Sequence, residues 1–236
     1  MASYDAKKFF EGVLINDDSL TFEITEELVL TGVLLGTNFQ LLKSIYKVYR
    51  NLGTTFEHKP MVGAKLSVFF DYEKQCVTFD RQSNQFVLTI PQFLHYIGKI
   101  DMAFAPIYPV GTTVELDESM LPEAVAEMFI EGELGAIVTL TGRKVPLMEG
   151  FDNYIVDYLG RLWPFGEIPG NDPILVSNMM IKRVITESYT NEYEEAFSFD
   201  VLRATQALNQ QISTAYMTTE KAISYYETLS ALSKTE

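Results

Sequence analysis

Residues 65–88 read KLSVFFDYEKQCVTFDRQSNQFVL and contain three short runs of residues that favour β-strands. Apolar and polar side chains approximately alternate along the first run, as they do in a strand that buries one face. A cluster of turn-forming residues at 80–84 separates the second run from the third. The pattern predicts a hairpin or a β-meander in the first half of the chain.

A helical pattern precedes these strands. Steps of three and four residues, which place side chains on one helix face, separate the members of an apolar set: Phe39, Leu42, Ile45, Tyr46 and Tyr49. We expect Asn38 to cap the start of this helix and Gly53 to supply a left-handed stop after Leu52.

Weaker signals complete the N-terminal region. Residues 4–12 favour a short helix, and Thr25 is expected to cap a helix whose first turn is acidic. The apolar run at 28–35 is too short to distinguish helix from strand. Pro91 suits the first turn of a helix that continues to Ile100. We therefore predict an N-terminal α+β region over residues 1–105.

The segment APIYP at residues 105–109 is the best candidate for a boundary, because its two prolines remove backbone donors and favour extended geometry. Beyond it, glycines separate predicted strands at 112–116, 135–140, 153–159 and 181–185, and a short helix begun by Pro122 is predicted over 121–130. The second of these strands is expected to end at 142–144. Short strands with tight turns predict a small, strongly bent antiparallel sheet or barrel over residues 106–197.

The last segment, residues 198–236, contains neither proline nor glycine. Apolar residues recur there at steps of three, four and seven: Val201, Leu208, Ile212, Ala215, Ala222, Tyr226 and Leu229. This spacing predicts one long amphipathic helix. The predicted fold class is therefore α+β, with a helix and β-meander region, a small bent antiparallel β domain and a long C-terminal helix.

Composition restricts the partners. The chain has 18 Lys and Arg against 32 Asp and Glu, a formal charge of −14. This charge disfavours nucleic acid, whose phosphates need a basic surface. The start of the chain lacks the apolar run of a secretory signal, and no stretch has the roughly 20 apolar residues of a spanning helix. The sequence therefore predicts a protein without a membrane partner, either unexported or exported without a cleaved signal. Its single cysteine, Cys76, fits the reducing cytoplasm, which is the location we predict.

The residues that carry chemistry are few. His58, His95 and Cys76 lack the close spacing of zinc ligands or of a nucleophile with its base, and no phosphate-binding glycine motif is present. We expect no catalytic residues, no metal and no cofactor. The one acidic cluster, Glu192, Glu194 and Glu195, is better explained as the acidic first turn of a helix. A hydrolase that uses clustered carboxylates remains an unfavoured alternative.

Aromatic residues suggest an interaction surface instead. Trp163 and Phe165 flank a proline, where aromatic side chains can anchor a partner, and Tyr158 fits either a core or an interface. The long helix would add one apolar face. The candidate partner-binding residues are Trp163, Phe165, Tyr158, Leu208, Ile212, Tyr216 and Tyr226.

Residues 106–197 resemble a known bacterial family. The strand at 108–114, YPVGTTV, is followed in order by TLTGRK at 139–144, YIVDYLG at 154–160 and WPFG at 163–166. An aliphatic strand, IKRVI at 181–185, and the acidic segment YTNEYEE at 189–195 complete the series. In this order the motifs resemble the domain of unknown function numbered forty-one seventy-six, encoded in Gram-positive bacteria beside LXG toxins of type VII secretion systems. Residues 118–133 and Phe165 depart from the family pattern.

This resemblance implies a function. It implies a cytoplasmic, non-catalytic accessory protein that binds a cognate secreted LXG toxin as a chaperone or targeting factor, and that meets components of the secretion system. An immunity protein that neutralises the toxin is the alternative. The acidic composition suits either role, because it speeds the capture of a basic partner.

Overall fold

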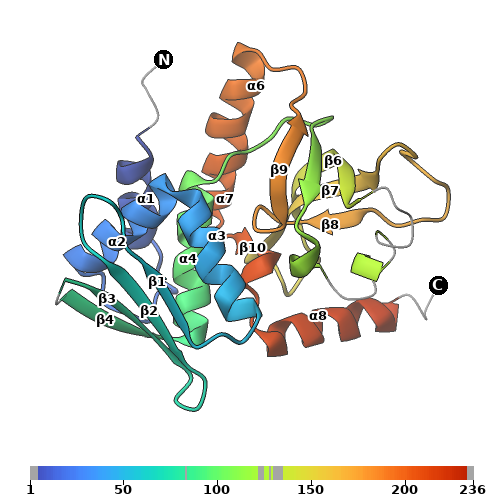
Figure 1. Ribbon diagram of the computed structural model, residues 1–236. Helices are drawn as coiled ribbons and strands as arrows, with labels where there is room; N and C mark the ends of the chain where they lie inside the picture. The colour runs from blue at the N-terminus through green and yellow to red at the C-terminus, as the bar shows by residue number, and fades with distance from the viewer. Residues whose placement is uncertain (1–4, 83, 122–124, 128, 130–134, 233–236) are drawn as a thin grey trace.

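The computed structural model describes residues 5–82, 84–121, 125–127, 129 and 135–232. It combines helices with two sheets, so the α+β class is confirmed. In Figure 1 the N-terminal helices and the first sheet lie on one side of the molecule, and the second sheet lies on the other.

The first sheet is an antiparallel meander in the order β1-β2-β3-β4. Its strands are β1 (Thr55–His58), β2 (Leu66–Asp71), β3 (Cys76–Arg81) and β4 (Asn84–Thr89). The meander predicted for residues 65–88 is therefore confirmed. Strand β1 was not predicted. It has only four residues, and none of them is fully buried.

Four helices accompany this sheet: α1 (Ala6–Ile15), α2 (Glu26–Thr37), α3 (Phe39–Arg50) and α4 (Ile90–Phe104). Thr25 caps α2 as predicted, accepting a hydrogen bond from the backbone N–H of Leu28 at 3.2 Å. The predicted ends of α3 are wrong in two respects. Asn38 makes no side-chain capping bond, and the left-handed residue after the helix is Leu52, with φ of 54°, rather than Gly53.

Glycine at position 36 permits α2 to approach α4 closely. A Cβ atom at Gly36 would lie 2.2 Å from the ring of Phe104, which is well inside van der Waals contact. Helix α4 packs on β3 and β4 and also on the C-terminal segment of the chain. It is thus the central element of the first core, and its buried side chains include Phe93, Tyr96 and Ile97.

The second sheet follows the order β10-β7-β6-β5-β9, and β8 also pairs with β7. Its strands are β5 (Thr113–Leu116), β6 (Ile137–Pro146), β7 (Tyr154–Leu162), β8 (Ile174–Val176), β9 (Ile181–Thr186) and β10 (Ile212–Ser213). They enclose a second core around Val114, Val138 and Tyr158. Strand β6 does not end at 142–144 as predicted, because a register shift between Leu140 and Gly142 lets pairing with β7 continue.

Other elements join the two halves. The short helix η1 (Glu118–Met120) follows β5, and Met120 packs in the first core. The side chain of Lys43 on α3 donates to the carbonyl oxygen of Ile181 at 2.5 Å, and Lys47 pairs with Asp117 at 2.9 Å. A helix was predicted for residues 121–130. Part of this range, including Pro122, lies outside the described residues.

The prediction of one long C-terminal helix is wrong. The segment divides into α6 (Glu192–Ala196), the π-helix η2 (Phe197–Arg203), α7 (Ala204–Leu208), β10, η3 (Thr214–Tyr216) and α8 (Thr219–Leu232). Gln210 adopts a φ of 56°, which turns the chain after α7. Ile212 and Tyr216 then enter the first core, and β10 pairs in parallel with β7. The chain therefore turns to bury Ile212 and Tyr216 instead of continuing as one helix.

Among the described residues, no single helix has the length and apolar character to cross a membrane. Helices α2 and α3 together have the length and the apolar composition of a span, but the chain bends by 103° between them.

Candidate functional site

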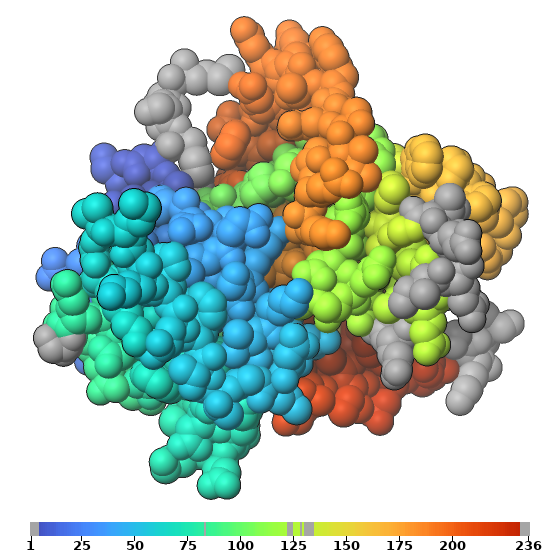
Figure 2. Space-filling model, in the orientation of Figure 1, coloured from blue at the N-terminus to red at the C-terminus, as the bar shows by residue number. Residues whose placement is uncertain are grey.

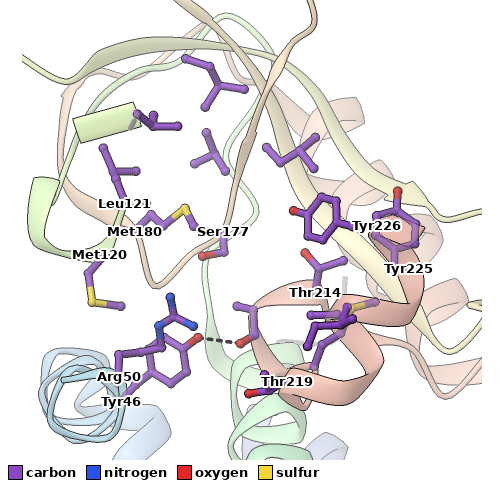
Figure 3. A pocket seen from close by; sticks show the side chains of 18 of the residues that line it. Tyr46, Arg50, Met120, Leu121, Ser177, Met180, Thr214, Thr219, Tyr225 and Tyr226 are labelled. Carbon is purple, nitrogen blue, oxygen red and sulfur yellow. Dashed lines mark hydrogen bonds between the residues drawn. The ribbon is translucent and has the colours of Figure 1, made fainter. Parts of the chain in front are cut away.

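A large hollow lies as a groove between α8 and the second half of the fold. It has a volume of about 1350 Å³, and its walls come from α3, η1, β8, η3 and α8. In Figure 3, Met120, Leu121 and Met180 line one side, whereas Tyr225 and Tyr226 line the other. We call this feature the α8 groove. Its lining is mainly apolar, so it presents hydrophobic surface to whatever enters.

Helix α8 lies on the surface rather than in the core. None of its residues at 219–231 is buried, and Ile223 and Tyr226 in the groove wall are 53% and 59% exposed. Figure 2 shows α8, in red, along the lower edge of the molecule. Two contacts with one ring help to hold it: Phe151 meets Tyr225 at 5.1 Å and the ammonium of Lys221 at 5.3 Å. The apolar face of α8 is therefore only partly covered.

A few polar groups lie at the base of the α8 groove. The Tyr46 hydroxyl donates to the carbonyl oxygen of Ala215 at 2.6 Å, and burial raises the pKa of Tyr46 to about 12. Ser177 is buried, and its hydroxyl has no partner among the described residues. Arg50 and Glu227 supply one charge of each sign to the lining. These groups can orient a bound segment, but they include no paired base and nucleophile.

Behind the groove, a buried polar cluster joins α4 to the second sheet. Asp157 accepts from Lys144 at 2.9 Å, from the backbone N–H of Asn178 at 3.1 Å and from the hydroxyl of Ser213 at 2.6 Å. The Asn178 side-chain amide also donates to Asp101, at 3.1 Å. Burial, together with the negative charge of Asp157, raises the pKa of Asp101 to about 7.

Both carboxylates of this cluster are closed to solvent, since Asp157 is 0% and Asp101 is 1% exposed. Neither lines the α8 groove. A substrate would have no access to them, so the cluster serves to connect α4, β7 and β10.

A second buried ionic cluster contains His95. Asp17 lies 2.6 Å from the ammonium of Lys99, and Nε2 of His95 lies 2.8 Å from the same carboxylate. Despite the opposing effect of burial, the hydrogen bonds from Lys99, Ser19 and His95 lower the pKa of Asp17 to about 2. Burial lowers the pKa of His95, so the ring is neutral near pH 7. The cluster connects the loop after α1 with α4.

The acidic cluster predicted at the start of the C-terminal region does not form a site. Glu194 receives hydrogen bonds from both terminal nitrogens of Arg143, and Ser198 donates to it at 3.0 Å. Glu192 and Glu195 are exposed on α6. The three carboxylates therefore do not converge on one point. Among the described residues, no group of three or more His, Cys, Asp or Glu could hold a metal ion.

The predicted partner-binding residues fall into two classes. Trp163, Phe165, Leu208 and Tyr226 are exposed, and Tyr226 lies in the α8 groove. Tyr158, Ile212 and Tyr216 are buried, which corrects their assignment as contact residues. The Tyr158 hydroxyl, for example, donates to the carbonyl oxygen of Pro106 at 3.0 Å. These three side chains stabilise the fold that carries the exposed ones.

Sequence reasoning missed most of the α8 groove. Strand β8 has three residues and follows a segment rich in glycine and proline, so no strand period is visible there. Tyr46 was recognised only as part of a helix face. No family model matches the chain, and no match was found among curated proteins or among solved structures.

Proposed function

We propose that this protein binds a segment of another protein in the α8 groove and performs no bond-making chemistry of its own. The observation that carries the proposal is the size and lining of the groove. Small-molecule pockets hold about 300–1,000 Å³, whereas the α8 groove has about 1350 Å³ and mainly apolar walls. These dimensions suit a polypeptide segment that lays one apolar face into a groove.

The half-covered face of α8 also supports binding. Ile223 and Tyr226 leave more than half of their surface in water, and burying apolar surface contributes about 25 cal/mol per Å². A partner that covers these side chains is stabilised by this free energy. No residue of α8 at 219–231 is buried, so none has to leave the core on binding.

We further propose that the partner is a secreted LXG toxin of a type VII secretion system, held in the cytoplasm until export with the help of secretion components. The support for this identity is the order of motifs over residues 106–197 and the charge of −14, which favours capture of a basic partner. The protein would then act as a chaperone or targeting factor.

Binding of a catalytically inactive LXG toxin from the same genome tests the proposal. We expect Ile223→Asp to weaken the affinity at least tenfold, because it places a charge on the groove wall. Ile15→Asp is the matched control, since Ile15 is also an exposed isoleucine, at the last position of α1 and outside the groove lining. Equal affinity of the two variants would refute binding in the groove.

The same complex separates the proposed role from immunity. A targeting factor leaves the purified active toxin enzymatically competent, whereas deletion of its gene stops toxin export. Normal export with loss of self-protection would instead assign an immunity function.

A further inference from the structure

The helix built from α6, η2 and α7 carries a row of exposed apolar side chains. Tyr193 and Leu208 are 85% and 82% exposed, and Phe197 and Val201 between them are 44% and 45% exposed. Isolated exposed apolar residues are ordinary, but a contiguous patch indicates an interaction surface. In Figure 1 this helix extends away from the body at the side opposite to α8. We call these four residues the α6–α7 stripe.

The four residues of the stripe lie on one continuous helix. The backbone stays right-handed helical across both junctions of η2, so residues 192–208 form one continuous helix. Along it, steps of four and seven residues separate the members of the stripe, and this spacing places side chains on one helix face. Ser198, Arg203 and Gln206 occupy the opposite, buried face.

That buried face holds the helix firmly. Arg203 donates to the carbonyl oxygens of Met102 and Ala105 at the end of α4, the latter at 2.6 Å. Arg143 on β6 pairs with Glu194, and its guanidinium lies 5.3 Å from the ring of Phe197. A helix fixed at both ends presents its free face with little further loss of entropy on binding.

The exposed charges on this helix have one sign, and the nearby Arg143 is already paired with Glu194. Glu192, Glu195 and Asp200 are exposed on this helix, and Glu187 precedes it. From residue 187 to residue 209 the single basic residue is Arg203, which is buried. A surface of this kind attracts Lys and Arg and repels carboxylates.

We propose that the α6–α7 stripe is a second docking surface, and that its partner is an amphipathic helix of another protein with Lys or Arg on both sides of an apolar row. Apolar contact between the two rows supplies affinity, and the acidic flanks select the basic partner. A second copy of this chain is the poorer occupant, because each copy has a charge of −14 and the stripe offers no exposed base to offset it.

Two synthetic helical peptides test this surface. They share one row of leucines and differ only in flanking residues, Lys in one and Glu in the other. We expect the Lys peptide to bind at least tenfold more tightly in fluorescence anisotropy, and the difference to shrink as salt increases. The double variant Val201→Ser with Leu208→Ser should lose at least tenfold of this affinity. Val87→Ser, at an exposed valine on β4, should keep it.

Three results would overturn the assignment. The first is Lys-peptide binding that the double variant leaves unchanged, and the second is equal binding of both peptides. The third is a dimer in sedimentation equilibrium that the double variant dissociates, because the stripe would then contact a second copy. The Ile223→Asp variant should bind the Lys peptide normally, which separates this surface from the α8 groove.

Discussion

The hydroxyl of Ser213 donates a hydrogen bond of 2.6 Å to Oδ2 of Asp157. Ser213 lies on β10 near the end of the chain, and Asp157 lies in the middle of β7. Both residues are fully buried. The bond therefore fixes the C-terminal segment to the second sheet from the inside.

The Ser213→Ala variant removes this donor and leaves Asp157 with bonds from Lys144 and Asn178. We expect a loss of about 1.5–3 kcal/mol in the free energy of unfolding, the usual effect of a hydrogen bond to a buried charge. Urea unfolding measures it. Ser44→Ala is the control, since Ser44 is exposed on α3 and bonds only locally to Gln40. Equal stability of the two variants would contradict the proposed role of the bond.

Asp101 should make stability depend on pH. Its pKa rises from an ordinary value of 3.8 to about 7 in the folded protein, so the folded state binds more protons than the unfolded state between these values. The contribution of this group to stability is therefore present below pH 4 and declines as the pH rises to about 7, by at most about 1.4 kcal/mol per unit.

The Asp101→Asn variant keeps an oxygen for the Asn178 amide and cannot ionise. We expect its stability to decline less than that of the wild type between pH 4 and pH 7. Thermal unfolding across this range measures the difference. Asp18→Asn, at an exposed position, should reproduce the wild-type profile. A parallel decline in the Asp101 variant would show that this carboxyl does not cause it.

The C-terminal segment should tolerate one truncation and not another. Deleting residues 219–236 removes α8, none of whose residues at 219–231 is buried, so we expect the melting temperature to fall by only about 2–4 °C. Deleting residues 210–236 also removes Ile212 and Tyr216 from the first core, and cooperative unfolding should be lost. Calorimetry of both forms measures this. A stable protein after the longer deletion would contradict the assigned core.

Two glycine substitutions should have opposite effects. Gly36→Ala places a Cβ 2.2 Å from the Phe104 ring, and such overpacking typically costs about 1–3 kcal/mol. Gly12→Ala on α1 meets nothing within 4 Å and should stabilise the protein by about 0.5–1 kcal/mol. Chemical denaturation compares the two variants. A neutral Gly36 variant would mean that α2 and α4 can separate without loss.

The sequence predicted the elements whose contacts lie close together in the chain. The meander from β2 to β4 is visible in the sequence because each strand pairs with its neighbour in the chain. The cap at Thr25 is visible for the same reason, since its partner is three residues away.

The C-terminal region shows where this reasoning fails. Spacing alone places Ile212 and Tyr216 on one helix, but they pack against residues of the N-terminal half, such as Tyr46. No short-range signal reports a partner that far away in the chain. The α8 groove was missed for the same reason, because its walls come from five separate elements.

The pairing of β10 with β7 also sets the order of events during synthesis. The first core lacks two of its large side chains, and the second sheet lacks its edge, until the chain has been made as far as Tyr216. Until residue 216 has been added, both halves therefore remain unfinished. During that interval a factor at the exit tunnel can act on the open chain.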